Sequence, residues 1–277
     1  MEIVKKYILE EIDILDKNRK THYKVKYSNK YYLDMMMYLL NDINNWSFLK
    51  NIQGYWEYLK KEVVPKYHYK TIQNKFNYWT DKGIFKNAFN KLNSNENFNM
   101  LFIDSTSITN KYGSENITIN PEYKKKKVTK LSIISNESGF ILAIEPFDIK
   151  NKLKNGNLTS VHDVKIIEKT LKNVDVNNNS KYYYLVGDKA YKNNYNLILN
   201  NKKVITITPN KKNCLIKNSI KHDNKLKKRI VIEHVNLELK RYERCTIRKD
   251  KKINIFLSWI YISGLLNNIR IIKKTNI

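Results

Sequence analysis

Cysteine, glycine and proline are scarce in this sequence, and each scarcity excludes a class of protein. The 277 residues include two cysteines, Cys214 and Cys245, which have neither a CxxC spacing nor a histidine partner. They indicate neither a disulfide framework nor a zinc site. The seven glycines form no Walker loop, and the HExxH and GxSxG motifs are missing. The first residues lack a signal-peptide pattern, and the best apolar window, 255–266, is too short to span a bilayer. We therefore expect an intracellular protein in which this window forms a buried helix.

Acidic residues are also in the minority. The chain has 26 Asp and Glu against 52 Lys and Arg, which gives a formal net charge of +26. This asymmetry points to nucleic acid or another anionic surface as the partner. Only six of the basic residues are arginine, and Lys, Asn, Ile and Tyr are heavily used, as an AT-rich coding sequence would give. We therefore attribute part of the positive net charge to base composition and not to selection for binding. A hydrophobic content of 42% supports a packed core rather than a disordered polycation.

The first 97 residues carry apolar side chains at helical spacing. This spacing predicts helices over 33–49 and 49–64, the second ended by Pro65. A third helix is predicted over 67–79, with Ile72, Phe76 and Trp79 on one face. Gly83 then serves as its C-cap before a short helix over 84–92.

The polar face of the third predicted helix carries Lys70, Gln73, Asn74 and Asn77. Two helices with a short break and outward polar groups fit a helix-turn-helix DNA-binding unit, with Lys70 as a DNA contact. A plain amphipathic hairpin fits this segment equally well. The polar run 93–97 is the expected linker, so we expect an N-terminal helical domain over 1–97 and a second domain over 98–277.

Beyond residue 97 the pattern changes to strands alternating with helices. Strands are predicted at 99–104, 127–135, 139–145, 182–187 and 203–208, helices at 162–171, 193–199, 229–241 and 253–272, and a basic loop at 211–228. In the 162–171 helix, Asp163 is expected to act as an N-cap and Val164, Ile167 and Leu171 to line one face. This order predicts an α/β fold, a ribonuclease H-like mixed sheet flanked by helices.

Three carboxylates stand where such a fold could aim them at one point. Asp104 and Asp188 each end an apolar strand, and Glu233 lies in a predicted helix. Two strand-end aspartates and a helix-borne glutamate are what a pair of Mg²⁺ ions needs to be held over a phosphodiester. Each has a simpler explanation alone: a strand-end turn cap for Asp104, a surface turn for Asp188, and a solvated helix position paired with Arg229 for Glu233. All three simpler explanations together would require three coincidences in the right order, so we favour the metal site.

These residues resemble the three blocks of bacterial insertion-sequence DDE transposases. The blocks are Phe102-Ile-Asp104-Ser-Thr-Ser, Gly187-Asp188-Lys-Ala-Tyr191, and Arg229-x3-Glu233-x6-Lys240. The last matches the family's Tyr-x2-Arg-x3-Glu-x6-Lys signature, except that Leu226 stands where the signature has Tyr. The segment Val128-Thr-Lys-Leu-Ser-Ile-Ile-Ser is also similar to the family's second strand pair.

The resemblance implies a transposase that cuts transposon-end DNA and joins the freed 3′-hydroxyl to target DNA. It implies Asp104, Asp188 and Glu233 as catalytic ligands of two Mg²⁺ ions, for which Mn²⁺ would substitute, and at least a homodimer on double-stranded DNA. Arg229 and Lys240 would face phosphate, and Lys189, Lys130 and Lys70 are further candidate DNA contacts. Two alternatives remain open: a nuclease of the same fold that only hydrolyses, and a DNA-binding protein derived from a transposon that no longer cuts.

Overall fold

A computed structural model describes most of the chain in eleven stretches. These are residues 1–17, 28–40, 46–49, 68–93, 98–120, 126–148, 162–174, 182–192, 197–199, 201–210 and 219–275. The helix predicted at 49–64, apart from Leu49, and the linker at 93–97, apart from Asn93, lie outside the described residues, as does Cys214.

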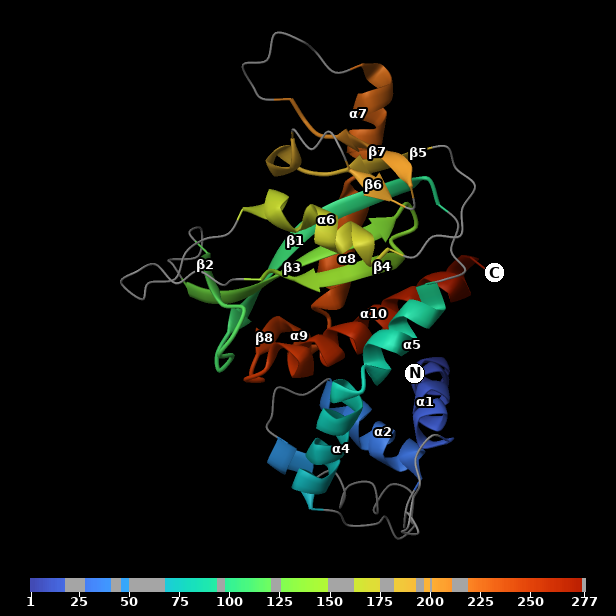
Figure 1. Cartoon of the computed structure of the whole chain (residues 1–277), viewed down its shortest axis with the longest axis vertical. Coiled ribbons are helices and arrows are strands. Elements are labelled where there is room, and N and C mark those ends of the chain that lie inside the picture. The colour runs from blue at the N-terminus through green and yellow to red at the C-terminus, as the bar shows by residue number, and fades with distance from the viewer. Residues whose placement is uncertain are drawn as a thin grey trace.

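A mixed sheet forms the centre of the upper part of the molecule (Figure 1). Strand β1 (Met100–Asn110) pairs antiparallel with β3 (Lys126–Asn136), which pairs antiparallel with β4 (Ile141–Pro146). On its other side β1 pairs in parallel with β5 (Tyr182–Val186), which pairs in parallel with β7 (Lys202–Ile207). The predicted mixed α/β class is thereby confirmed.

Three short strands complete the sheet, and one of them leaves a gap beside β1. Strands β2 (Thr118–Asn120) and β6 (Ile198–Leu199) extend the β3 and β7 edges. Strand β8 (Ile247–Arg248) pairs in parallel with the end of β1, on the side where β5 pairs with its beginning. Among the described strands, none pairs with residues 103–108 of β1 on that side.

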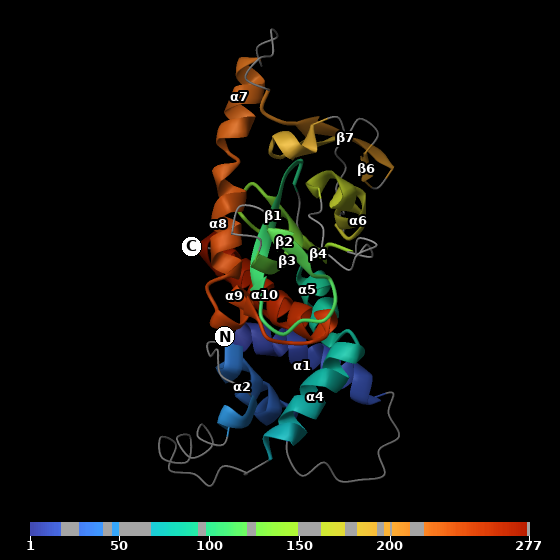
Figure 2. The same cartoon turned by 90° about the vertical axis from the view of Figure 1, so that its left-hand side faces the viewer.

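Helices cover both faces of the sheet (Figure 2). Helix α8 (Ile230–Leu239) packs on one face, against β1 and β3. The short helices η2 (Asp163–Ile166) and α6 (Ile167–Lys172) lie on the other face, where α6 contacts β3 and β4. Helix α7 (Ile220–Lys227) precedes α8 and extends beyond the sheet.

The N-terminal helices gather below the sheet and pack on the C-terminal helix. These are α1 (Glu2–Lys17), α2 (Asn29–Leu40), α4 (Tyr69–Asp81) and α5 (Ile84–Asn93). Helix α10 (Ile253–Thr275) contacts α1, α4 and α5, and it also contacts β4 and α8 (Figure 1). A single hydrophobic core therefore runs from the N-terminal helices into the sheet. The domain division at residue 97 stays a prediction.

The pairing of α4 with α10 explains why the stripe on α4 is apolar. Ile72, Phe76 and Trp79 are fully buried, as predicted, and the ring of Phe76 stacks on that of Trp259 with centroids 4.3 Å apart. Gly83 has φ +72°, the left-handed conformation that ends α4 and that residues with a Cβ rarely adopt. The predicted C-cap region is therefore confirmed.

A buried asparagine ties α10 to the edge of β4. The side chain of Asn268 accepts a hydrogen bond from the backbone N–H of Ile141 and donates one to its carbonyl, each 2.8 Å long. It also donates to Oδ1 of Asn93 on α5, at 3.0 Å. These bonds pair the backbone groups of Ile141 at a strand edge inside the core, where unpaired backbone groups would be costly.

Helix α10 is longer than predicted, and the prediction that this segment is too short to span a membrane is wrong. Its 23 residues are, among the described residues, long and apolar enough to cross a bilayer by length and composition. However, 78% of its most apolar window is buried inside the protein, as in the core helix of a globular domain. The prediction of a buried helix is thus confirmed.

Three other element predictions need correction. Strand β1 does not end at Asp104 but continues to Asn110, because β3 remains paired with it as far as Thr109. Residues 198 and 199, expected in a helix, form β6 because they pair antiparallel with β7. The basic segment expected as a loop contains helix α7, capped by Ser219, whose hydroxyl accepts a hydrogen bond from the N–H of His222.

The segment that begins at Asp163 also differs from its prediction. Its N-cap is His162, which makes no side-chain capping bond, and Asp163 forms an ion pair with Lys130 instead. Val164 is exposed because the first turn is a 3-10 helix, whose tighter winding rotates it away from the face shared by Ile167 and Leu171.

Candidate functional site

Asp104 lies in the middle of β1, beneath helix α8. Its Oδ2 accepts a hydrogen bond of 2.8 Å from Nδ2 of Asn236, on α8. Burial raises the pKa of Asp104, and the negative charges of Asp163 and Asp188 act in the same direction. A backbone hydrogen bond from Ser105 and the positive charge of Arg229 oppose this rise. Asp104 is therefore a half-buried carboxyl whose charge would be stabilised by a nearby cation.

Asp188 follows the strand that neighbours Asp104. Phe102 and Val186 are the last partners in the parallel pair of β1 and β5. Asp104 lies two residues further along β1, and Asp188 lies two residues past Val186, where β5 ends. The negative charge of Asp188 raises the pKa of Asp104, so the two carboxylates are close in space. The side chain of Asp188 is exposed, and its Oδ1 accepts a 2.6 Å bond from the backbone N–H of Lys189. The two predicted aspartates are thus brought together.

The turn between β5 and Asp188 depends on a glycine. A Cβ on Gly187 would lie 2.7 Å from Cδ2 of Tyr191 and 3.0 Å from Cγ2 of Ile103. Tyr191 belongs to the short helix η3 (Lys189–Tyr191) and is fully buried. Burial raises the pKa of its hydroxyl, and this ring supports the turn that presents Asp188.

Asp163 is a third aspartate near this pair. Its negative charge contributes to the raised pKa values of Asp104 and Tyr191, and its own partner is Lys130. The sequence interpretation favoured an N-cap for Asp163 and gave a place at the border of the site as the alternative, which its charge effect on Asp104 supports. Nothing in the local pattern separates a capping aspartate from one that faces the sheet, since only the packing of η2 decides it.

Glu233 lies on α8 but is engaged elsewhere. Its Oε1 is 2.7 Å from Nη2 of Arg229, one turn earlier, and half of its side chain is exposed. The predicted shared face of Arg229 and Glu233 is confirmed. Among the described residues, no three His, Cys, Asp or Glu side chains are close enough to hold one metal ion. The contact from α8 to Asp104 is made instead by Asn236, three residues after Glu233 and so on a neighbouring part of the helix.

The oxygen donors nevertheless fit a hard divalent cation. Asp104 and Asp188 are adjacent carboxylates, and like charges in a half-buried setting favour a bound cation. Glu233 could join them only after leaving Arg229. The structure therefore offers two of the three predicted ligands together and holds the third in an ion pair on the helix above.

Four of the five predicted DNA contacts surround this pair of aspartates. Arg229 and Lys130 make the ion pairs described above, and Lys189 is exposed beside Asp188. Lys240 follows the last residue of α8, and burial lowers its pKa while the charge of Asp104 opposes this. Lys70 is exposed on α4, in the N-terminal helices, and no described contact links it to the aspartates.

A polar groove of about 580 Å³ adjoins the site beside the second half of β1 and the start of β3. Hydroxyl groups of Ser105, Ser107 and Thr109 line it, together with Lys126 and Lys240. No acidic residue lines it among the described residues. The extension of β1 past Asp104, which the sequence interpretation did not foresee, builds this groove.

Comparisons with known proteins agree with the fold. No protein-family profile matches the chain, and no curated protein matches its sequence. Among solved structures, the chain is similar to a piggyBac transposase in a synaptic complex with hairpin DNA, with a TM-score of 0.54 and 13% identity. This match covers 100% of the present chain and 73% of the transposase. A Mos1 transposase in a pre-cleavage transpososome gives a TM-score of 0.20 at 12% identity, over 93% of the present chain and 80% of the Mos1 chain. A TM-score this low does not indicate a shared fold. The chain thus shares the fold of a DNA transposase.

Proposed function

We propose that the protein is a DDE transposase with a ribonuclease H-like catalytic sheet, and that it acts on double-stranded DNA. The strand order β4-β3-β1-β5-β7, with its first two pairings antiparallel and its next two parallel, supports this sheet. The observation that carries the proposal is that Asp104 lies on β1 beneath α8, and that Asp188, just past the end of the neighbouring strand β5, is close enough for its charge to raise the pKa of Asp104. The transposase fold of the structural neighbour supports it independently.

Asp104, Asp188 and Glu233 would hold two Mg²⁺ ions. Bound there, the ions would supply an activated water and neutralise the charge that develops on the phosphoryl oxygens. Asn236 orients the carboxylate of Asp104 through its 2.8 Å hydrogen bond. Arg229, released from Glu233, and Lys240 would bind phosphate beside the scissile bond.

The reaction would nick a strand at each transposon end and then use the freed 3′-hydroxyl to attack target DNA. Joining two ends would call for at least a homodimer, and an action on chromosomal DNA would require the protein to be inside the cell. The groove along β1, with its hydroxyls and two lysines, suits a sugar-phosphate backbone running to the aspartates.

One observation favours a second function, a DNA-binding protein without cleavage. Glu233 is paired with Arg229, so the third ligand is not directed at the aspartates. A nuclease that only hydrolyses would use the same residues as the transposase, and only its products would differ.

Strand cleavage of the gene's own flanking DNA separates these functions. We expect the wild type to nick discrete ends with Mg²⁺ or Mn²⁺, and Asp104→Ala, Asp188→Ala and Glu233→Ala to lose at least a hundredfold in rate. Glu168→Ala, an exposed carboxylate in the first turn of α6, serves as the matched control. Joined products identify a transposase, and nicks alone a nuclease. Binding of the ends without cleavage in either metal would leave only the DNA-binding function.

A further inference from the structure

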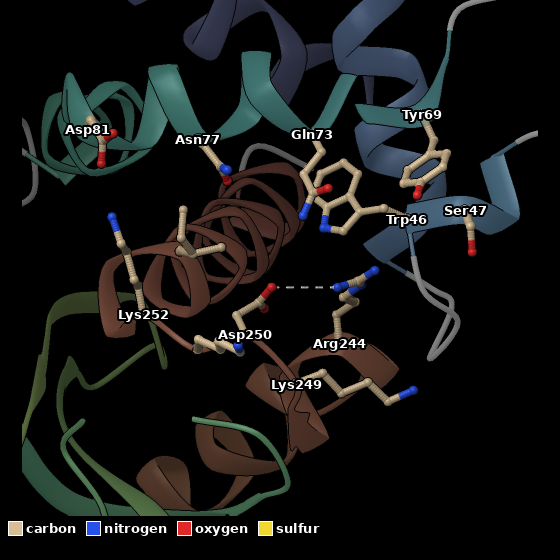
Figure 3. A pocket seen from close by; sticks show the side chains of 12 residues that line it. Trp46, Ser47, Tyr69, Gln73, Asn77, Asp81, Arg244, Lys249, Asp250 and Lys252 are labelled. Atoms are coloured by element: carbon tan, nitrogen blue, oxygen red, sulfur yellow. Dashed lines mark ion pairs between the residues drawn. The ribbon is translucent and has the colours of Figure 1, made fainter. Parts of the chain in front are cut away.

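A second pocket lies away from the aspartates, between the N-terminal helices and the segment that precedes α10. It has a volume of about 620 Å³ and opens to solvent (Figure 3). One wall is α4 with the short helix η1 (Trp46–Phe48), and the other is the segment from α9 (Glu243–Thr246) to residue 252. This segment contains β8, which pairs with the end of β1, up to six residues beyond Asp104. At 3.3 Å per residue, the pocket is roughly 20 Å from that carboxylate.

The first wall combines an aromatic face with two amides. Trp46 is buried against Phe76 and Trp259 and lines the pocket with the small exposed part of its indole ring. The side chains of Gln73 and Asn77 point from α4 toward the opposite wall (Figure 3). The two amides are four residues apart on one helix, so they lie on one face with their donors and acceptors side by side. The polar face of α4, expected to read duplex DNA, is thus partly directed into a pocket.

The second wall is basic and rigidly held. Lys249, Lys251 and Lys252 line the pocket, and the fully buried Arg248 fixes the loop that carries them. Its guanidinium donates to the carbonyl oxygens of Asp250 and Lys251, at 3.0 and 2.7 Å. The loop is therefore preorganised, which lowers the entropic cost of binding an anion.

A long ion pair between Arg244 and Asp250 lies between the two walls of the pocket. Nη1 of Arg244 and Oδ1 of Asp250 are 3.9 Å apart, which is too far for a hydrogen bond. The guanidinium of Arg244 lies 5.6 Å from the ring centre of Trp46. With four basic and two acidic residues in its lining, the pocket favours a ligand that is an anion and also has polar edges and a flat ring.

We propose that this pocket binds one unpaired nucleotide. A base has a polar edge that Gln73 and Asn77 can hydrogen-bond, as these side chains do with adenine, and a flat face that can lie against the exposed part of Trp46. Its phosphate meets the lysines of the loop. The pocket size is that of a small-molecule site, so it admits a nucleotide and excludes a duplex. The nucleotide is either free or part of an unpaired stretch of a DNA strand.

Fluorescence titration in EDTA tests this proposal without any cleavage. The probes are a short single strand with a central 2-aminopurine, the same strand in a duplex, and dAMP as a competitor. We expect the wild type to quench the single-stranded probe, and Gln73→Ala/Asn77→Ala to weaken this binding at least tenfold. Asn74→Ala is the matched control, because it is an exposed amide on the same helix that does not line the pocket. Duplex binding should not change in either variant.

The competitor distinguishes the two sources of the nucleotide. Competition by dAMP shows that the pocket takes the free mononucleotide, and its absence shows that the nucleotide must belong to a strand. The proposal is overturned if the wild type does not quench the single-stranded probe, or if the double variant binds it as tightly as Asn74→Ala. Because the assay requires neither Mg²⁺ nor Asp104, either outcome leaves the cleavage proposal to its own test.

Discussion

At the scale of single residues, Asn236 is the side chain most directly tied to the proposed chemistry. It holds Asp104 from above, and groups that orient a metal ligand typically affect metal affinity or activity by 10- to 100-fold. We therefore expect Asn236→Ala to slow cleavage by about that factor, and raised Mg²⁺ to restore part of the rate. The measurement is the cleavage rate against Mg²⁺ concentration.

The control for this substitution lies on the same helix. His234→Ala changes an exposed neighbour that does not contact Asp104, and it should leave the rate and its Mg²⁺ dependence unchanged. Equal rates for Asn236→Ala and the wild type at every Mg²⁺ concentration would show that Asp104 needs no such support.

Sequence patterns anticipated the two aspartates better than their surroundings. Asp104 and Asp188 follow apolar runs, and a buried strand can be recognised in a sequence from its apolar composition. Asn236 and Asp163 gave no such signal, because a polar residue on a helix is ordinary until the packing shows which face meets the sheet. The ion pair of Glu233 with Arg229 was foreseeable from their spacing alone.

At the scale of elements, the long apolar periods were predictable and the short strands were not. Helices α4 and α5 follow their 3.6-residue patterns closely, and α10 follows from its continuous apolar run, which is buried on all sides. The extension of β1 to Asn110 rests on pairing with β3, and β8 consists of two residues whose partner lies far away in the sequence. Such pairings depend on tertiary contacts, which local propensity does not encode.

The junction of α9 with α10 yields a prediction on pH. Cys245 is completely buried there, and its thiol donates to the carbonyl oxygen of Trp259 at 3.6 Å. Burial raises the pKa of this thiol from 9.0 to about 12. Above pH 9 the unfolded chain releases this proton and the folded protein keeps it, so this group should lower stability by about 1.4 kcal/mol per pH unit.

Urea denaturation at pH 8, 9 and 10 under reducing conditions measures this effect. Tyrosines and lysines also titrate in this range, so the comparison is with Cys245→Ala, in which only this thiol is missing. We expect the free energy of unfolding of the wild type to fall more steeply above pH 9 than that of the variant. Parallel curves would show that the thiol is not shielded in the folded protein.

At the scale of the whole molecule, the N-terminal helices and the sheet share α10. Trp259 on this helix stacks on Phe76 of α4, and Tyr261 lies 5.5 Å from the ring of Phe89 on α5. The predicted boundary at residue 97 thus separates segments that bury each other's apolar surface. The predicted DNA-binding and catalytic segments would therefore move as one body rather than as two domains on a linker.

This shared core predicts that residues 98–277 do not fold alone. Without residues 1–97, one side of α10 would expose Trp259, Tyr261 and their neighbours, a large apolar patch that promotes aggregation. We expect the fragment to elute as aggregates in size-exclusion chromatography and to lack the near-ultraviolet circular dichroism of the full chain. Co-expression with the 1–97 fragment should restore a soluble complex, since it supplies the missing face. A monomeric 98–277 fragment that unfolds cooperatively would instead establish two independent domains, and α10 would then have to cover its own apolar side.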